Sequence, residues 1–265
     1  MIREMITSYW LWFGIIITGA LIFTAYPGGY ASTSHHLLHG LCAQTPSHTL
    51  LIGNKPLPFD ARMTGIYGGL LVGMATIVIR GKLFHYGSPS RPVIVGLATC
   101  VIAMAIDGTN SLLHDLALWH PYPPANILRV ITGYLAGIAL SVMLTWLLAS
   151  SVWNLGRPGH GVGSIPELLV PVLFLVPYVG LLLAAPAVMH FPLSIALVTS
   201  AWITVSIIML VIVLLVFRLD EQVRTVRHLH VPGAVAALLG VGVMLALAGL
   251  RFWMEQTFGI SNAMM

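Results

Sequence analysis

Long apolar runs separated by short polar segments make up most of the chain. An α-helix rises about 1.5 Å per residue, so about 20 apolar residues cross the hydrocarbon core of a bilayer. Seven runs approach this length: Ser8–Tyr26, Met63–Ile79, Pro92–Leu113, Ala125–Val152, Pro166–Val188, Pro192–Phe217 and Val231–Trp253. No alternation with the period of a β-strand competes with them. The pattern predicts an all-α, polytopic transmembrane helix bundle of about seven spans.

The composition agrees with a membrane protein. Apolar residues make up 58% of the 265 positions, and Asp, Glu, Lys and Arg together only 8%. A soluble domain is about one quarter charged, so the lipid bilayer is the expected partner of this surface. The formal net charge of +4 comes from scattered side chains, which gives nucleic-acid binding no support. We predict a multi-pass protein of the cell inner (plasma) membrane.

The first apolar run has two interpretations. Arg3 precedes Ser8–Tyr26, and Gly29-Tyr30-Ala31 follows it as an acceptable cleavage site, as in a secretory signal peptide. The run is longer than the apolar part of most signal peptides and contains several aromatic residues. An uncleaved anchor is therefore the preferred interpretation.

The distribution of Lys and Arg predicts the orientation, because these residues gather in cytoplasmic loops. With a cytoplasmic N-terminus, the inside holds Arg3, Arg80, Lys82, Arg91, Arg157, Arg218, Arg224 and Arg227, and the outside holds Lys55, Arg62, Arg129 and Arg251. We therefore predict a cytoplasmic N-terminus. Residues 1–265 then form a single membrane domain, with a long extracytoplasmic loop at 27–62 and an additional three-helix part at 165–253.

Three charged residues fall within or at the edge of the spans, all near the outer face. Arg62 starts the second span, Asp107 lies in the third, and Arg129 lies in the first turn of the fourth. A charged side chain in hydrocarbon costs at least about 2.5 kcal/mol on insertion scales. We expect Asp107 to face the bundle interior and to pair with one of the two guanidinium groups. Polar residues that follow on the same helical face are Asn110, Ser111 and His114.

Glycines at four-residue intervals predict close helix packing around these charges. Gly65, Gly69 and Gly73 form one such stripe in the second span, and Gly133 and Gly137 form another in the fourth. The predicted ligand-binding residues are Arg62, Tyr67, Asp107, Asn110 and Arg129. Two interpretations stay open: an outward-facing polar cavity that holds a ligand, ion or head group, or an ion-pair clamp that only orients the helices.

The fifth span contains Pro171, Pro177 and Pro186, which predict kinks because proline removes a helical hydrogen bond. Glu167 lies near the inner end of this span, where we expect it to meet Arg157.

The long loop carries side chains that could bind a metal. His39, Cys42, His48 and Asp60 offer imidazole, thiolate and carboxylate ligands, although their spacing matches no standard site. The alternative is a solvated loop whose histidines adjust surface charge near neutral pH. Within this loop, the segment Ser34–Cys42 is a candidate for a short helix lying on the membrane surface.

Part of this region resembles a known family. Cys42-Ala43-Gln44, and then Pro58-Phe59-Asp60-Ala61-Arg62-Met63-Thr64-Gly65-Ile66-Tyr67, resemble an uncharacterised family of bacterial polytopic membrane proteins, a domain of unknown function. The family pattern reads Cys-His-Gln, Arg-Ser-Phe and Cys-x-Arg-Cys-x-Gly-Ile-Tyr, followed by an Asp-Gly pair and an arginine-containing span. Asp107-Gly108 and Arg129 match these later features, so the resemblance covers about residues 38–140.

The departures from that pattern lie at the family's cysteines. Of these only Cys42 is kept, and Ala43, Asp60 and Met63 stand where the pattern has His, Cys and Cys; His48 replaces the arginine. A tetrahedral thiolate site cannot be built from the remaining side chains. The family carries no assigned activity, so the resemblance implies a membrane core and no particular chemistry.

Three functions remain as hypotheses. The first is binding or transport of a small ligand or ion at the polar site among spans two to four. The second is a structural or assembly subunit of a larger membrane complex, with another membrane protein as partner, since spans five to seven have almost no ionisable residues. The third is a membrane metal or redox enzyme. The first is preferred, an enzyme is disfavoured, and no cofactor is predicted.

Overall fold

The computed structural model describes residues 12, 14–21, 23, 29–219 and 222–259. Up to residue 151 the elements are α2 (Gly29–Leu38), β1 (Thr49–Ile52), β2 (Lys55–Asp60), α3 (Ala61–Ile79), β3 (His85–Gly87), α4 (Arg91–Asp115) and α5 (Asn126–Ser151). They are followed by β4 (Arg157–His160), α6 (Ile165–Leu173), α7 (Leu175–Ala184), α8 (His190–Val216) and α9 (His230–Phe258). Short 3-10 helices occupy Pro46–His48, Ala187–Met189 and Val226–Leu229.

The prediction of a polytopic helix bundle is confirmed. Within the described residues, six helices are long and apolar enough to cross a membrane, with α6 and α7 counted together as one span. They correspond to the second through seventh predicted spans, with ends that differ by a few residues. Most of the first predicted span, Ser8–Tyr26, lies outside the described residues; the part described, 12, 14–21 and 23, is helical.

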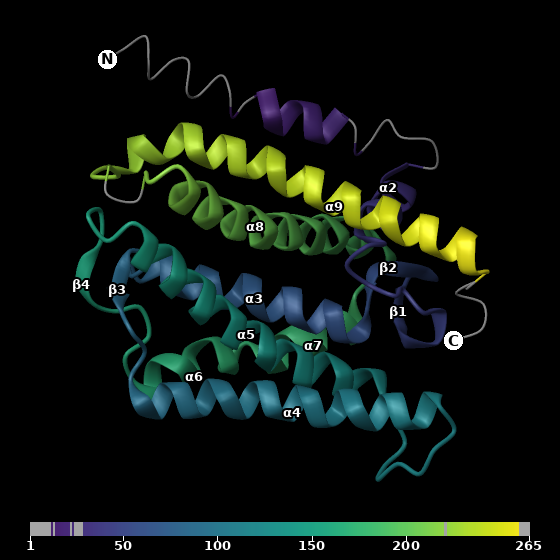
Figure 1. The fold of residues 1–265 in the computed structure, drawn as a ribbon. Helices are drawn as coiled ribbons and strands as arrows, with labels where there is room; N and C mark the ends of the chain where they lie inside the picture. The colour runs from purple at the N-terminus through teal and green to yellow at the C-terminus, as the bar shows by residue number, and fades with distance from the viewer. Residues whose placement is uncertain (1–11, 13, 22, 24–28, 220–221, 260–265) are drawn as a thin grey trace.

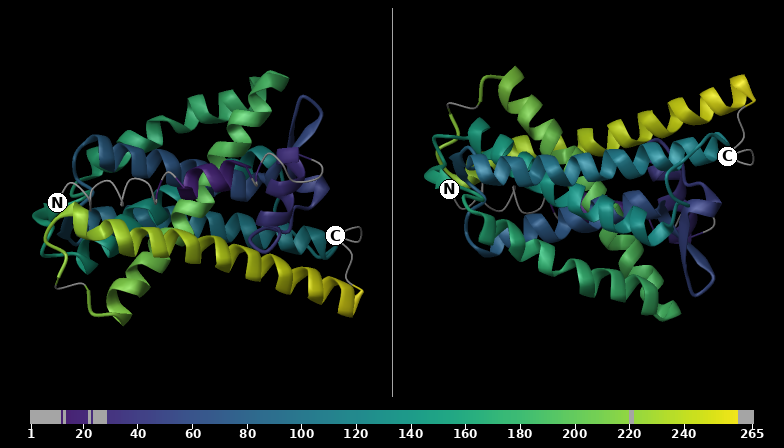
Figure 2. Two further views of the ribbon diagram at one scale, coloured as in Figure 1. Left: turned by 90° about the horizontal axis from the view of Figure 1, so that it is seen from above. Right: turned by 90° about the horizontal axis from the view of Figure 1, so that it is seen from below.

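The long helices run side by side, and their connections gather at two opposite ends (Figure 1). We call one end the hairpin end; it holds connections 29–60, 116–125 and 185–189. We call the other the basic end; it holds connections 80–90 and 152–164 and residues 217–219 and 222–229. The views in Figure 2 show the same two ends. Helices α3 and α5 lie between α4, α6 and α7 on one side and α8 and α9 on the other.

Helices α3 and α5 are in backbone contact along their glycines, as predicted. A Cβ atom added at these glycines would overlap main-chain atoms of the opposite helix. The glycine and the residue it meets are Gly65 with Val130, Gly69 with Tyr134, Gly133 with Arg62, and Gly137 with Ile66. Only glycine permits this approach, which also fixes Arg62 beside the start of α5.

The fifth span is broken, as its prolines predicted. Helix α6 ends at Leu173 and α7 begins at Leu175, with Pro171 inside α6. At the break the Pro171 carbonyl accepts two hydrogen bonds, one of 3.2 Å from the Phe174 amide and one of 3.0 Å from the Tyr134 hydroxyl of α5. The span therefore keeps its shape through a contact with the core helix.

The long loop is more ordered than its sequence suggested. Antiparallel strands β1 and β2 pair in a hairpin, whose turn places Gly53 and Asn54 at φ of 57° and 61°. Both central residues of a tight hairpin turn of this kind need positive φ. Phe59 of β2 is fully buried. The helix expected at Ser34–Cys42 instead spans Gly29–Leu38, and it packs against α9 and β2.

The two ends differ in their basic residues in the way that the predicted orientation requires. Arg80, Lys82, Arg91, Arg157, Arg218, Arg224 and Arg227 belong to the basic end, and Lys55, Arg62, Arg129 and Arg251 to the hairpin end. We therefore expect reporter fusions after Ile79 and Ser164 to report the cytoplasm, and a fusion after Asp115 to report the outside. The reverse pattern of reporter activity would contradict this orientation.

Candidate polar site at the hairpin end

The predicted pairing of Asp107 is confirmed, and its partner is Arg62. The Asp60 side chain caps α3 by accepting the Met63 amide at 2.8 Å, which places Arg62 in the first helical turn. Arg62 Nη2 lies 2.8 Å from Asp107 Oδ2. The Asp107 residue is 1% exposed, whereas the Arg62 side chain is 24% exposed. The pair thus joins α3 and α4 at the boundary between the buried bundle and its outer surface.

Two hydroxyl groups complete the environment of the Asp107 carboxylate. The Tyr122 hydroxyl donates to Oδ1 at 3.2 Å, and the Thr132 hydroxyl lies 3.3 Å from Oδ2. Burial and the nearby carboxylate raise the pKa of Tyr122, so its hydroxyl keeps the proton that it donates. Charge-assisted hydrogen bonds of this kind are what make a buried carboxylate tolerable.

Asn110 holds the connection at residues 116–125 over this carboxylate. Its side-chain amide donates to the Tyr122 carbonyl at 2.9 Å and accepts from the Tyr122 amide at 3.4 Å. This two-way contact fixes Tyr122 above Asp107. The sequence did not predict a role for Tyr122, and its only signal was an aromatic residue between prolines in a short connection.

Arg129 is 5% exposed and lies beside the ion pair. Its Nη1 donates to Asn126 Oδ1 at 2.8 Å, its Nε lies 3.4 Å from Ser111 Oγ, and its Nη2 lies 3.2 Å from His48 Nε2. All three partners are uncharged groups. Within the described residues, no carboxylate lies at ion-pair distance from Arg129. The site therefore holds two guanidinium groups but only one buried carboxylate.

His48 accepts rather than donates in this cluster. Burial and the Arg129 charge lower the pKa of His48, which favours the neutral imidazole. Because Arg129 is a donor only, Nε2 of His48 is the accepting nitrogen. Asp115 Oδ1 is 3.6 Å from the same nitrogen, and the Asp115 side chain is 41% exposed.

Tyr67 was predicted to belong to this site, and the structure places it elsewhere. Its ring stacks on Phe59 with ring centroids 4.6 Å apart, within an apolar cluster that also contains Leu38 and Cys42. Successive helical residues turn by about 100°, so a residue five positions after Arg62 points about 140° away from it. Tyr67 therefore packs the core below the hairpin and does not face Asp107.

The four metal-ligand candidates do not come together: Cys42 lies beside Asp60, whose amide donates to the Cys42 sulfur at 3.4 Å, and the two histidines have other partners. His39 contacts Glu255 at 2.8 Å, Asp60 caps α3, and His48 contacts Arg129. Burial, with Asp60 nearby, raises the pKa of Cys42 to about 12, so its thiol stays protonated. Across the described part of the chain, no three His, Cys, Asp or Glu side chains are arranged to hold a metal ion.

Comparison with known proteins shows which part of the chain has relatives. Residues 42–143 match the family model described as "Predicted membrane protein (DUF2085)". An uncharacterized protein from Methanocaldococcus jannaschii is 33% identical over 100 residues, which are 38% of this chain and 58% of that protein. The chain thus spans less than two thirds of that relative's length. No solved structure matches the chain.

The match agrees with the region in which the family resemblance was expected, and the relative is archaeal, whereas the resemblance was to bacterial proteins. Every residue of the polar site lies inside the matched region, and α6 through α9 lie outside it. The family is described as a predicted membrane protein, and neither match carries an activity.

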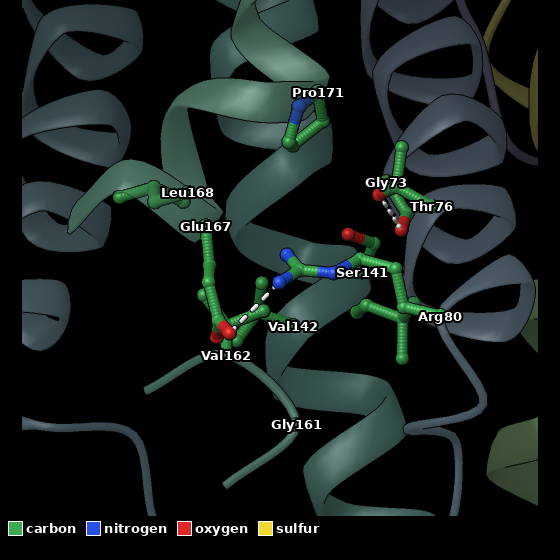
Figure 3. Close-up of a pocket in the computed structure, with 11 residues that line it drawn as sticks. Gly73, Thr76, Arg80, Ser141, Val142, Gly161, Val162, Glu167, Leu168 and Pro171 are labelled. Carbon is green, nitrogen blue, oxygen red and sulfur yellow. Dashed lines mark hydrogen bonds and ion pairs between the residues drawn. The ribbon is translucent and has the colours of Figure 1, made fainter. Parts of the chain in front are cut away.

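A second ionic cluster, with a small cavity, lies at the basic end (Figure 3). Glu167 was expected to meet Arg157; its Oε1 instead lies 2.8 Å from Arg80 Nη2 and 2.5 Å from Lys82 Nζ. Helix α3 ends beside α6, so residues just past α3 reach Glu167 first. The cavity has a free volume of about 10 Å³, the space of one water molecule, and its charges are already paired.

Proposed function

We propose that this membrane protein binds or transports a small polar ligand or ion at the hairpin end of α3, α4 and α5, from the outer side of the cell inner membrane. The residues of this proposed site are Arg62, Asp107, Asn110, Ser111, Tyr122 and Arg129. The proposal rests on the outward orientation inferred from the basic residues.

The observation that carries the proposal is the second buried arginine. A clamp between α3 and α4 needs one ion pair, which Arg62 and Asp107 supply at 2.8 Å. Arg129 adds a guanidinium that is 5% exposed and has only uncharged partners. Buried charge in a membrane protein is costly and typically serves function.

The connection at 116–125 supports the proposal because it covers the site and is attached to it by few contacts. Trp119 is 81% exposed and Leu118 is 53% exposed, so the tip of the connection makes little contact with the protein. Its Tyr122 is held through Asn110 and Asp107. Opening of this connection would give a ligand access to Arg62 and Arg129.

The test is a thermal-shift panel on purified protein, with soluble anions, cations and neutral polar compounds, for the wild type and Asp107→Asn. We expect some compounds to stabilise the wild type and to change in apparent affinity by at least about tenfold in the variant: weaker for a cation or neutral compound that contacts Asp107, and tighter for an anion, which this carboxylate repels. Tyr122→Phe, which removes one hydrogen bond to Asp107, should also shift the affinity of the same compounds even if Asp107→Asn is poorly folded. Glu167→Gln is the matched control, because this carboxylate belongs to the ionic cluster at the basic end and should leave binding unchanged.

Two results would contradict the proposal. One is a panel in which no compound stabilises the wild type. The other is a set of stabilising compounds whose affinities are the same in the wild type, Asp107→Asn and Tyr122→Phe.

A further inference from the structure

The two guanidinium groups of the proposed site converge on one uncharged oxygen atom. Arg62 Nη2 lies 3.1 Å from Ser111 Oγ, and Arg129 Nε lies 3.4 Å from the same atom. Ser111 is 3% exposed. A neutral hydroxyl thus occupies a position between two positive charges, where an anionic oxygen would be stabilised far more strongly.

The buried part of the site holds two guanidinium groups and one carboxylate. Arg62 and Arg129 each carry a positive charge, and Asp107 is the one buried carboxylate among the described residues of the site. The lowered pKa of His48 keeps this histidine neutral. Asp115, whose side chain is 41% exposed and contacts His48, and the half-buried Asp60 act on Arg129 from a distance, without direct contact. Arg129 therefore has no carboxylate within ion-pair distance, and the carboxylates that offset its charge lie partly in water or belong to the Arg62 pair.

Arg62 also has a donor without an acceptor. Its Nε is buried, and it has no hydrogen-bond partner among the described residues. Buried hydrogen-bond donors without an acceptor are rare in folded proteins, so this nitrogen points to an acceptor that the protein itself does not supply. An anion that lies between the two arginines could accept from this nitrogen and from Arg129.

We infer that the ligand of the proposed site is an anion with a carboxylate or phosphate group, held between Arg62 and Arg129 beside Ser111. This inference rests on the proposed function and names the class of its ligand. Guanidinium groups bind these anions through two parallel hydrogen bonds, which a halide or a neutral polar group cannot match. Free carboxylates and phosphates carry this chemistry, and so does an anionic lipid head group.

The first experiment measures anion binding directly. Purified protein in phosphatidylcholine nanodiscs is titrated with sodium phosphate and with sodium acetate at constant ionic strength. We expect a saturable rise in Tm with at least one of them, weakened at least about tenfold in Arg129→Gln. Arg80→Gln is the matched control, because it removes an arginine from the ionic cluster at the basic end and should leave the titration unchanged.

The second experiment places the negative charge inside the protein. Ser111→Asp puts a carboxylate between the two arginines, and we expect a higher Tm without added anion together with loss of the anion response. Ser111→Asn has a similar size and no charge, and should not raise the Tm. This pair keeps the inference testable even if Arg129→Gln fails to fold.

The third experiment identifies whether the anion is soluble or a lipid head group. Nanodiscs of phosphatidylglycerol replace those of phosphatidylcholine, without soluble anion. A rise in Tm that depends on Arg129 would assign the ligand to a lipid head group, whereas a response to soluble phosphate or acetate alone would assign it to a soluble anion. Both results support the inference.

The inference is overturned if neither soluble anions nor the anionic lipid shift the Tm and Ser111→Asp lowers it, or if the shift is the same in Arg129→Gln. If only cations or neutral compounds stabilise the protein, and their effect depends on Asp107, the ligand is not an anion and the inference fails. The proposed function then still holds. Absence of any compound that depends on Asp107 would remove both.

Discussion

Replacing Gly69 by alanine is expected to separate α3 from α5 and to destabilise the folded protein by about 3 kcal/mol or more. A Cβ atom at Gly69 would overlap the main-chain carbonyl of Tyr134, and main-chain atoms cannot rotate away as a side chain can. Gly137→Ala, which meets the Ile66 carbonyl, should have a similar effect. The measurement is the Tm and the yield of folded protein in detergent.

The matched controls are glycines whose added Cβ would meet nothing within 4 Å. Gly180 of α7 and Gly242 of α9 are in this position, so alanine there should leave the Tm unchanged or raise it slightly. Equal effects of alanine at Gly69 and at Gly180 would show that α3 and α5 do not touch through their backbones. The close contact matters for the site because it sets the position of Arg62 beside Arg129.

Replacing Asp107 by alanine is the second substitution with a large expected effect. Removing one partner of a buried ion pair costs about 3–5 kcal/mol, because the other charge is left unpaired. The Arg62 side chain is 24% exposed and water screens part of its charge, so we expect about 2 kcal/mol or more. The Tyr122 hydroxyl also loses its acceptor, whereas the Thr132 hydroxyl keeps the Leu128 carbonyl at 3.0 Å. The free energy of unfolding in mixed micelles is the quantity to measure.

The control for this effect is a double-mutant cycle with Arg62→Gln. The double variant should be more stable than the sum of the two single losses predicts, because it removes both charges together. Asp115→Asn, a half-exposed carboxylate, should change stability by no more than about 0.5 kcal/mol. Strict additivity of Asp107→Ala and Arg62→Gln would contradict the contact between these side chains.

The spans and the ion pair could be predicted because the bilayer imposes strong physical constraints. Apolar length fixed α3, α4, α5, α8 and α9 to within a few residues, and three prolines predicted the break between α6 and α7. A carboxylate exposed to hydrocarbon is costly, and this cost predicted that Asp107 pairs with an arginine. Glycine spacing predicted close helix packing along the second and fourth spans, and the structure brings these two stripes together in α3 and α5.

The other contacts of the site depend on the conformation of the connections between helices. The spacing of apolar residues along the sequence does not predict that conformation. Tyr122 reaches Asp107 only because connection 116–125 folds back over α4. Strands β1 and β2 have 4 and 6 residues, too few to show a pattern in an apolar chain. Tyr67 was assigned because it matches the family pattern together with Arg62, and helical geometry places its ring on another face of α3. Glu167 pairs with Arg80 and Lys82, which follow the end of α3, and not with Arg157 of connection 152–164.

The central claim is that an anion binds between Arg62 and Arg129, and an experimental structure of the full chain in saturating sodium phosphate tests it most directly. The claim predicts tetrahedral density within hydrogen-bond distance of both guanidinium groups, with the Asp107 pair retained. The claim is contradicted if the structure shows no added density beside Arg62 and Arg129, so that both guanidinium groups keep only their contacts within the protein.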